Sequence, residues 1–204
     1  MKDTPVKVLV SGFEPFGGSK LNPSQLLVNE LSLKEIPGVE IVSIILPVEF
    51  DAATNRLLEK VRESKPDIVI SFGQAEGRSA ITPEKIAINL DDARIPDNGG
   101  DQRKNQAIAA DGPDGYFSTL PVEKMVEEIK SVGVEASLSL SAGAFVCNHI
   151  FYRLQHDLKT SGVKSGFIHL PLVPEQHEEF PTQPTMELDE MVRGAIAAIK
   201  AAVS

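Results

Sequence analysis

The sequence predicts an α/β protein in which a largely parallel sheet is covered by helices on both faces. Short apolar runs, typical of buried strands, alternate along the chain with longer segments of helical periodicity. Strands that alternate with helices form parallel sheets through crossover connections. The 204 residues, 42% apolar and 24% charged, suffice for one core, and no linker or repeat divides them. We therefore expect a single domain over residues 1–204.

The first half of the chain supplies four expected strands and two expected helices. Asn22, Pro23 and Ser24 indicate a helix start, because proline is tolerated at an early helical position. The next helix ends before Pro66, which cannot continue it. The strands are expected at residues 6–10, 39–48, 67–72 and 85–90, and the helices at residues 22–33 and 50–63.

The second half begins with residues 91–116, which are rich in Asp, Asn and Gly and have little apolar periodicity. A loop of this length in a compact domain is usually functional or covered by a partner. Beyond it, Gly133 indicates the end of an amphipathic helix. Helices are expected at residues 122–132, 145–158 and 187–202, and strands at residues 136–140 and 167–172.

Composition disfavours several classes of function. The net charge is −9 and no Lys/Arg cluster stands out, so binding to nucleic acid or to an anionic membrane surface is not expected. No apolar run approaches the roughly 20 residues that span a bilayer. Residues 1–10 lack a signal-peptide pattern, and one cysteine cannot form a disulfide within the chain, so the expected location is the cytoplasm.

That cysteine, Cys147, is expected between the exit of a strand and the first turn of the helix at residues 145–158. Backbone N–H groups at a helix start carry partial positive charge, which favours a thiolate and lowers the pKa of the cysteine. The residue pattern is compatible with a nucleophile. Without further context, the pattern favours an inert buried thiol that packs like a small hydrophobic side chain.

His169 is the strongest candidate for a partner of the thiol. It lies near the end of an apolar strand, where open α/β sheets place their sites, although a hydrogen-bonded core histidine would look the same. The other histidines fit less well: His149 would point to another helix face than Cys147, His156 lies on the polar end of that helix, and His177 is in a charged loop.

Two further segments contain residues that could take part in binding or catalysis. The turn at residues 12–18 lacks the Lys-Ser/Thr of a phosphate loop, and its two phenylalanines suit a small flat apolar group better. Glu84 could orient an imidazole, but taken alone it is an ordinary surface glutamate. No residue spacing indicates a calcium or zinc site, so neither a metal nor another cofactor is expected.

Taken together, several motifs resemble the pyroglutamyl peptidase type I family, also called pyrrolidone-carboxylate peptidases, over nearly the full chain. Each motif is weak alone, but their order is specific. The motifs are SGFEPFGG at 11–18, NPS at 22–24, GQA at 73–75, GR at 77–78, EKIAIN at 84–89, DARIPDN at 92–98, AG at 142–143, VCN at 146–148, GFIHLP at 166–171 and PEQ at 174–176.

The resemblance implies a single-domain three-layer α/β/α sandwich with a largely parallel (mixed) sheet, often assembled as a homotetramer. It implies an omega-peptidase that cleaves peptides after an N-terminal pyroglutamyl residue through a thioester acyl-enzyme. The implied catalytic residues are Glu84, Cys147 and His169. By the same analogy the substrate-binding residues are Phe13 and Phe16 around the ring, Gln74 near the lactam and Arg94 near the acyl oxygen.

One departure and two alternatives qualify this interpretation. Many members carry Asn where this chain has Leu140, which affects the expected hydrogen bonding behind Cys147. A Cys-His-Glu glutamine amide hydrolase would use similar groups and would release ammonia from free glutamine. A non-catalytic α/β ligand-binding module, with Cys147 merely buried, is the alternative from another class.

Overall fold

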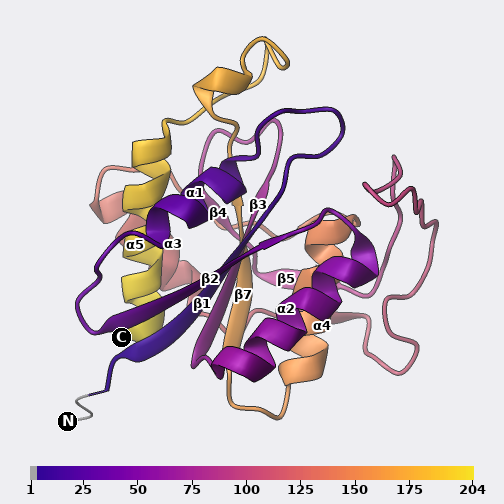
Figure 1. The fold of residues 1–204 in the computed structure, drawn as a ribbon, viewed down its shortest axis with the longest axis horizontal. Coiled ribbons are helices and arrows are strands. Elements are labelled where there is room, and N and C mark those ends of the chain that lie inside the picture. Colours follow the sequence, from indigo (N-terminus) through magenta and orange to yellow (C-terminus); the bar gives the residue numbers. More distant parts are fainter. Residues whose placement is uncertain (1–3) are drawn as a thin grey trace.

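The computed structural model describes residues 4–204 and is built around a five-stranded sheet (Figure 1). Four of the strands are mutually parallel, and the last is antiparallel to its neighbour. The sheet is therefore mixed and largely parallel, which confirms the predicted fold class. In spatial order its strands are β2 (Val39–Leu46), β1 (Val6–Phe13), β3 (Ile68–Gln74), β7 (Lys164–Leu170) and β4 (Thr82–Pro83).

Helices form a layer on each face of this sheet (Figure 1). One face carries α1 (Pro23–Leu31), α3 (Val122–Ser131) and α5 (Leu188–Val203), and the other carries α2 (Phe50–Ser64) and α4 (Val146–Leu158). Successive strand residues point to opposite faces. Accordingly Val8 and Val10 enter the core under α1 and α5, whereas Leu9 enters the core under α2 and α4. No helix within residues 4–204 is both long and apolar enough to cross a bilayer.

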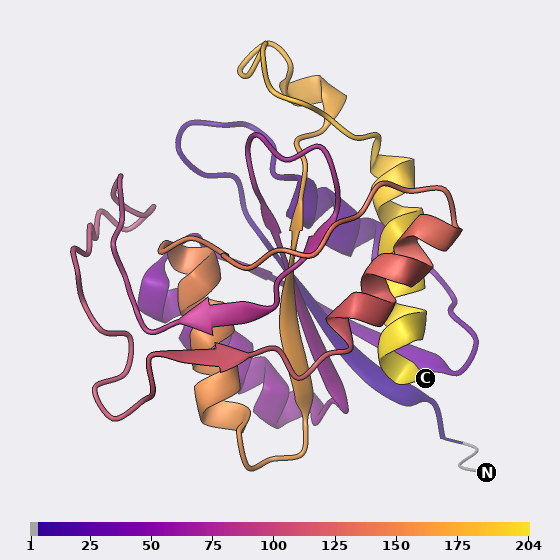
Figure 2. The same cartoon turned by 180° about the vertical axis from the view of Figure 1, so that it is seen from behind.

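A second, two-stranded sheet lies beside α4 (Figure 2). It pairs β5 (Ile86–Ile88) with β6 (Gly115–Phe117) in antiparallel fashion. The strand expected at residues 85–90 is thus present, but it is not part of the central sheet. The strand expected at residues 136–140 is wrong: only single bridges form there, Ile81 with Ala136 and Glu84 with Ser139.

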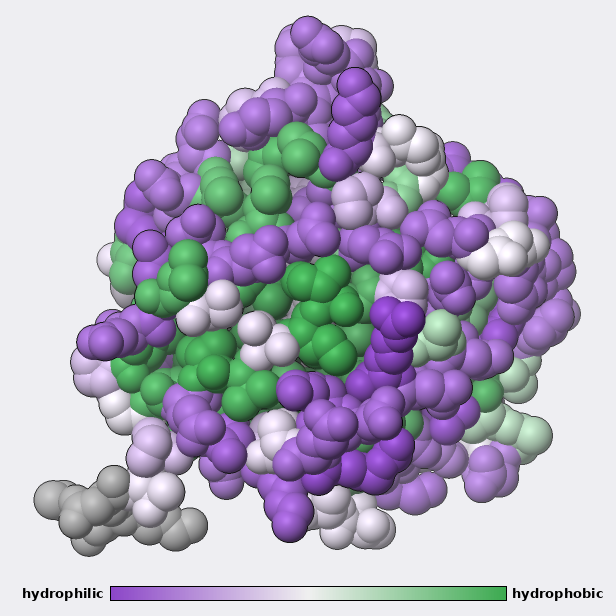
Figure 3. Space-filling view, in the orientation of Figure 1, coloured by the Kyte–Doolittle hydropathy of each residue, from purple (hydrophilic) through white to green (hydrophobic). Residues whose placement is uncertain are grey.

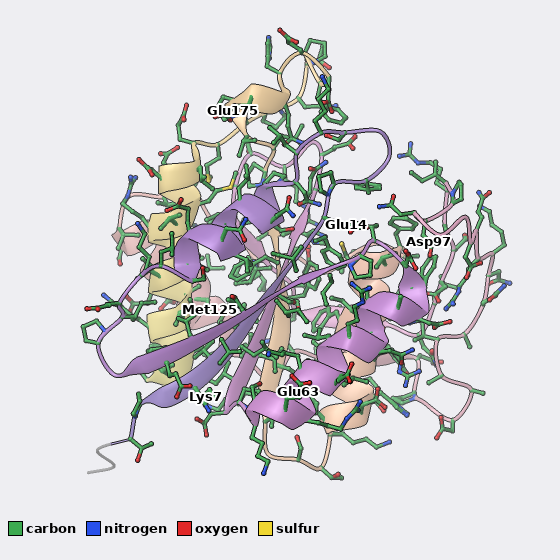
Figure 4. The ribbon with its side chains drawn as sticks, in the orientation of Figure 1. Lys7, Glu14, Glu63, Asp97, Met125 and Glu175 are labelled. Carbon is green, nitrogen blue, oxygen red and sulfur yellow. The ribbon has the colours of Figure 1, made fainter. Side chains whose placement is uncertain are left out.

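Strand order places a crevice at one end of the sheet. From β1 the chain passes to β2 on one side, and from β2 it returns to β3 on the other side of β1. Such a reversal opens a crevice beyond the carboxyl ends of the strands, where α/β proteins bind ligands. Figure 4 shows Glu14 and Asp97 at this end of the molecule, with Lys7 and Glu63 at the opposite end.

Candidate active site

A cavity of about 360 Å³ lies at the carboxyl end of the sheet. Its lining includes five residues predicted from the sequence: Phe13, Phe16, Gln74, Cys147 and His169. They come from the ends of β1, β3 and β7, from the turn after β1 and from the start of α4. A larger hollow of about 620 Å³ lies at the amino end of the sheet, but neither cysteine nor histidine lines it. The chemistry is therefore concentrated in the smaller cavity.

Cys147 is the second residue of α4, and the start of this helix is open. The preceding N-cap position holds Phe145, whose side chain has no oxygen to cap the helix. The first backbone bond of the helix runs from the His149 N–H to the Phe145 carbonyl. The backbone N–H groups of Val146, Cys147 and Asn148 thus have no partner outside the helix among residues 4–204, as expected for a helix start. They can serve an anion in the cavity.

Asn148 fixes this helix start in place. Its fully buried side chain accepts a hydrogen bond from the Ile88 N–H at 3.0 Å. It also donates to the carbonyls of Ile88 and Leu90 at 2.9 and 3.1 Å. The amide therefore binds the end of β5 as another strand would. These hydrogen bonds of Asn148 fix the position of the neighbouring Cys147 relative to the two-stranded sheet.

Gly73 leaves room for the sulfur. It lies in β3, directly opposite His169 in the parallel register with β7. A Cβ atom at this position would lie 2.9 Å from Cys147 Sγ and 2.7 Å from the Phe167 ring. Only glycine lets the thiol lie against the strand beside the His169 position.

His169 and Glu84 form a buried pair. His169 Nδ1 lies 2.7 Å from Glu84 Oε1, and the two residues are 4% and 0% exposed. The antiparallel pairing of Thr82 with His169 explains the contact, because it brings the residue after β4 to the side of β7. With Nδ1 held by the carboxylate, Nε2 is the ring nitrogen without a partner among residues 4–204, and it is free to exchange a proton with a group in the cavity.

Arg78 completes this arrangement. Its guanidinium donates to Glu84 Oε1 at 2.7 Å, to the Ser141 carbonyl at 3.0 Å, and to the Thr82 hydroxyl. Burial alone would raise the pKa of Glu84, but the hydrogen bond and charge of His169, together with Arg78, lower it below its usual value. Glu84 is therefore an ionised carboxylate at neutral pH, and this negative charge faces the His169 imidazole.

The protonation of the thiol differs from the sequence prediction. Burial raises the pKa of Cys147 to about 12, and the Glu84 carboxylate adds to this effect, whereas Arg78 and the backbone N–H only partly oppose it. Burial also lowers the pKa of His169 below its ordinary value of 6.5, against the opposing influence of Glu84. The expected lowering of the cysteine pKa by the helix start is thus wrong for the free protein. Both shifts favour the uncharged form of each group at neutral pH.

Aromatic rings form the apolar part of the cavity. Phe145 packs against Phe16 at 5.9 Å and against Phe50 at 5.4 Å between ring centroids. Phe13 packs against Phe167 at 6.5 Å and is only 2% exposed. Phe13 and Phe16 both line the cavity, and their predicted contact with a small flat group stays a prediction.

The turn after β1 is held by α1. The N-cap residue Asn22 accepts from the Ser24 N–H at 3.0 Å and donates to the Glu14 carbonyl at 3.0 Å. Ser24 in turn accepts from the Phe13 N–H at 3.0 Å. A Cβ at Gly12 would lie 2.4 Å from the Ser24 carbonyl oxygen, so glycine is required for this close approach. The NPS motif therefore positions the phenylalanine turn.

Arg94 lies elsewhere. It is exposed on the loop at residues 91–105 and is not among the residues that line the cavity within the described chain. The loop itself is firmly attached: Asp97 accepts from the Phe50 N–H at 3.1 Å, and Asn98 donates to Glu14 at 3.2 Å. The predicted contact of Arg94 with an acyl oxygen is thus not preformed and stays a prediction.

Comparison with known proteins decides the family. The family model described as pyroglutamyl peptidase matches residues 6–204. The chain belongs to the pyroglutamyl peptidase family. A pyrrolidone-carboxylate peptidase of Vibrio vulnificus strain CMCP6 is 50% identical over 188 residues, covering 92% of this chain and 88% of the relative. The crystal structure of pyroglutamyl peptidase I from Bacillus amyloliquefaciens superposes with a TM-score of 0.94 at 43% identity, covering 98% of this chain and 97% of that one. A mutant pyrrolidone carboxyl peptidase of Pyrococcus furiosus gives 0.93 at 39% identity, covering 97% and 98%.

Within this pyroglutamyl peptidase fold, sequence reasoning missed three residues of the site. Arg78 was noted in a motif but given no role, because its contacts with Glu84 and Ser141 arise only in the folded chain. Asn148 follows the cysteine directly, which was the available signal. Phe145 was assigned to a helix but lines the cavity instead. No group of three His, Cys, Asp or Glu side chains within residues 4–204 is arranged to hold a metal ion.

Proposed function

We propose that this chain is a cysteine-type omega-peptidase that hydrolyses the amide bond after an N-terminal pyroglutamyl residue. The observation that supports this most is a single cavity that Cys147 and His169 line together with Phe13 and Phe16. Glu84 lies behind His169 and orients it. The proposal assigns catalysis to Glu84, Cys147 and His169.

The reaction begins from a neutral thiol and a neutral imidazole. His169 Nε2 takes the proton of Cys147 as the sulfur attacks the carbonyl between pyroglutamate and the next residue. The Glu84 carboxylate stabilises the imidazolium that forms. Because charge develops only during attack, the free backbone N–H groups at the start of α4 stabilise the oxyanion in the transition state.

The attack forms a tetrahedral intermediate, and the reaction then proceeds through an acylation step and a deacylation step. His169 returns the proton to the leaving amine, the C–N bond breaks, and a pyroglutamyl thioester remains on Cys147. His169 next takes a proton from water, and the resulting hydroxide attacks the thioester carbonyl. The C–S bond then breaks, pyroglutamate leaves, and His169 returns its proton to the sulfur. We also assign Arg94 as a second donor to the acyl oxygen, a role that requires its side chain to move inward from its exposed position.

The substrate chemistry matches the cavity. A pyroglutamyl end has no ammonium group, so the site needs no carboxylate to bind one. The ring is small, flat and neutral, with one N–H and one C=O on its edge. We propose that Phe13 and Phe16 contact its faces and that Gln74 contacts its lactam.

Hydrolysis of a pyroglutamyl chromogenic amide tests the proposal. The wild type should cleave this amide and not the matching prolyl amide, and Cys147→Ala should abolish cleavage while the circular dichroism spectrum is unchanged. Ammonia release from free glutamine would instead support an amide hydrolase. Full activity of Cys147→Ala would refute the assigned nucleophile.

We further propose a cytoplasmic homotetramer. The cytoplasm keeps unpaired thiols such as that of Cys147 reduced, which suits a thiol nucleophile. Assembly is supported by Phe117 and Leu140, which are 66% and 70% exposed, and by the edge strand β2, near which Figure 3 shows apolar residues gathered. Light scattering after size-exclusion chromatography should give four times the chain mass. A monomer at all concentrations would contradict this assembly.

A further inference from the structure

We propose that Gln176 is a positioning residue that fixes the direction of the Gln74 amide, so that Gln74 offers N–H donors to the cavity and recognises the lactam carbonyl of the substrate. Gln176 lies in the short 3₁₀ helix η1 (Pro174–Gln176), just after β7. The inference rests on the proposed function and specifies how its substrate is recognised.

Two backbone groups set the direction of the Gln176 amide, because one can only donate a hydrogen bond and the other can only accept one. The Val173 backbone N–H can only donate, and it lies 3.1 Å from Gln176 Oε1. The Leu21 carbonyl can only accept, and it lies 3.3 Å from Gln176 Nε2. Both contacts would be repulsive if the amide were reversed. Gln176 is 1% exposed, so water cannot replace a lost partner.

The direction of the Gln74 amide follows from this. Gln176 Nε2 lies 3.0 Å from Gln74 Oε1, so the atom of Gln74 that faces Gln176 must be the acceptor. The Gln74 nitrogen then points away from Gln176 and has no partner among residues 4–204. Because Gln74 is the last residue of β3 and lines the cavity, its N–H groups are available to a ligand there.

The direction of the Gln74 amide determines which ring the cavity prefers. A pyroglutamyl ring has a carbonyl where a prolyl ring has a methylene, and only the carbonyl can accept from Gln74. A buried donor left unpaired discriminates strongly against the wrong ligand. Gln176 thereby determines the preference of the cavity for a ring acceptor, although it does not itself line the cavity.

Two substitutions at position 176 test the inference. Gln176→Met removes the donor and lets the Gln74 amide turn freely. Gln176→Glu offers an acceptor, so that Gln74 turns its nitrogen toward residue 176 and its oxygen toward the cavity. We expect KM for a pyroglutamyl chromogenic amide, and the inhibition constant of 2-pyrrolidinone, to rise together by about tenfold or more, while kcat changes less. Ser19→Ala is the matched control, because it removes another contact of Gln176 without touching Gln74.

A double-mutant cycle separates positioning from a merely structural role. In the Gln74→Met background, Gln176→Met should add no further rise in KM. Additive effects, or an unchanged 2-pyrrolidinone constant in both variants at position 176, would overturn the inference. If those variants do not fold, Gln74→Glu is used in their place. The new carboxylate accepts a hydrogen bond from Gln176 but presents only oxygen to the cavity. Wild-type affinity of this variant for 2-pyrrolidinone would refute the proposed direction of the Gln74 amide. A wild type that fails to cleave the amide would refute the proposed function instead.

Discussion

At the scale of single residues, the resting protonation of Cys147 and His169 sets how the reaction begins. Burial raises the pKa of the thiol to about 12 and lowers that of the imidazole, so neither group is charged near pH 7. Both shifts favour the neutral pair over an ion pair of thiolate and imidazolium in the resting protein. The helix start contributes mainly to the transition state, where its N–H groups face the new oxyanion.

The pH dependence of kcat/KM tests this assignment. His169 must be neutral to accept a proton, and its pKa is lowered, so activity should rise as pH increases through an apparent pKa below 6.5 and then stay level across neutral pH. The raised pKa of Cys147 predicts no second rise or fall near pH 8. A bell-shaped profile with a basic limb near that pH would show a resting ion pair and contradict the account.

The two cavity phenylalanines should respond differently to truncation. Phe16 is partly exposed, so Phe16→Ala should raise KM about tenfold and leave stability nearly unchanged. Phe13 belongs to the core at 2% exposure, so Phe13→Ala should also lower the free energy of unfolding by about 3–5 kcal/mol. Kinetics combined with urea denaturation separates the two effects. Leu33→Ala, at an apolar side chain that is 78% exposed and outside the cavity, is the control and should change neither quantity.

Single-residue roles could be predicted only partly from the sequence. The resemblance selected Cys147, His169 and Glu84. In the structure Cys147 and His169 line one cavity, and Glu84 lies 2.7 Å from the Nδ1 atom of His169. The protonation of the thiol could not be predicted, because it depends on burial by segments distant in sequence. Arg78 was missed for the same reason.

At the scale of elements, β3 must carry glycine at position 73, because a larger side chain there would occupy the space of the Cys147 sulfur. Gly73→Ala would place a methyl group 2.9 Å from Cys147 Sγ and 2.7 Å from the buried Phe167 ring. We expect kcat to fall by about 10²-fold, because small displacements of a nucleophile have large effects. The free energy of unfolding should fall by about 1–3 kcal/mol.

Gly99→Ala is the matched control for this substitution. The nearest atoms to a Cβ at Gly99 lie 3.4 Å away, which is an ordinary contact, and the residue has no positive φ. In the same assay, Gly99→Ala should therefore have the kcat of the wild type, whereas Gly73→Ala should not. Equal rates for Gly73→Ala and the wild type would contradict the assigned position of the sulfur.

Elements with long periodic patterns were predicted well, and short ones were not. The α2 and α4 helices were predicted to within one residue at each end, because their periodicity is local. β4 has two residues and one is Pro83, so its sequence has no strand pattern and only pairing with β7 defines it. The apolar alternation at residues 136–140 predicted a buried strand, which is wrong because Leu138 and Leu140 are exposed in the single chain.

At the scale of the whole molecule, strand order explains why residues so far apart in sequence meet. The reversal at β1 brings Phe13 and Gln74 to the ends of neighbouring strands, and β7 adds His169 beside them. The sequence predicted alternating elements and hence a parallel sheet. It did not predict that the segment after β4 would leave the central sheet to form β5, since that depends on the antiparallel turn at β4.

The long segment at residues 91–116 is attached to the molecule at both helices beside the site. Arg103 donates to Asp51 on α2 at 2.6 Å and to Asp91 at 3.1 Å, and Asp91 lies 2.8 Å from His149 Nδ1 on α4. The first part of the loop is therefore fixed beside the helix that carries Cys147. The sequence predicts that this loop is functional or covered by a partner, and that role stays a prediction; the structure shows only its attachment to α2 and α4.

Affinity labelling of the single cysteine tests the central claim most directly. The intact wild-type protein is treated with pyroglutamyl chloromethyl ketone, and the modified residue is identified by mass spectrometry. The account predicts one label per chain, on Cys147, formed much faster than with prolyl chloromethyl ketone and slowed by 2-pyrrolidinone. Labelling at another residue, or equal rates with the two reagents, would contradict the claim that this thiol attacks a carbonyl held by a pyroglutamyl-binding cavity.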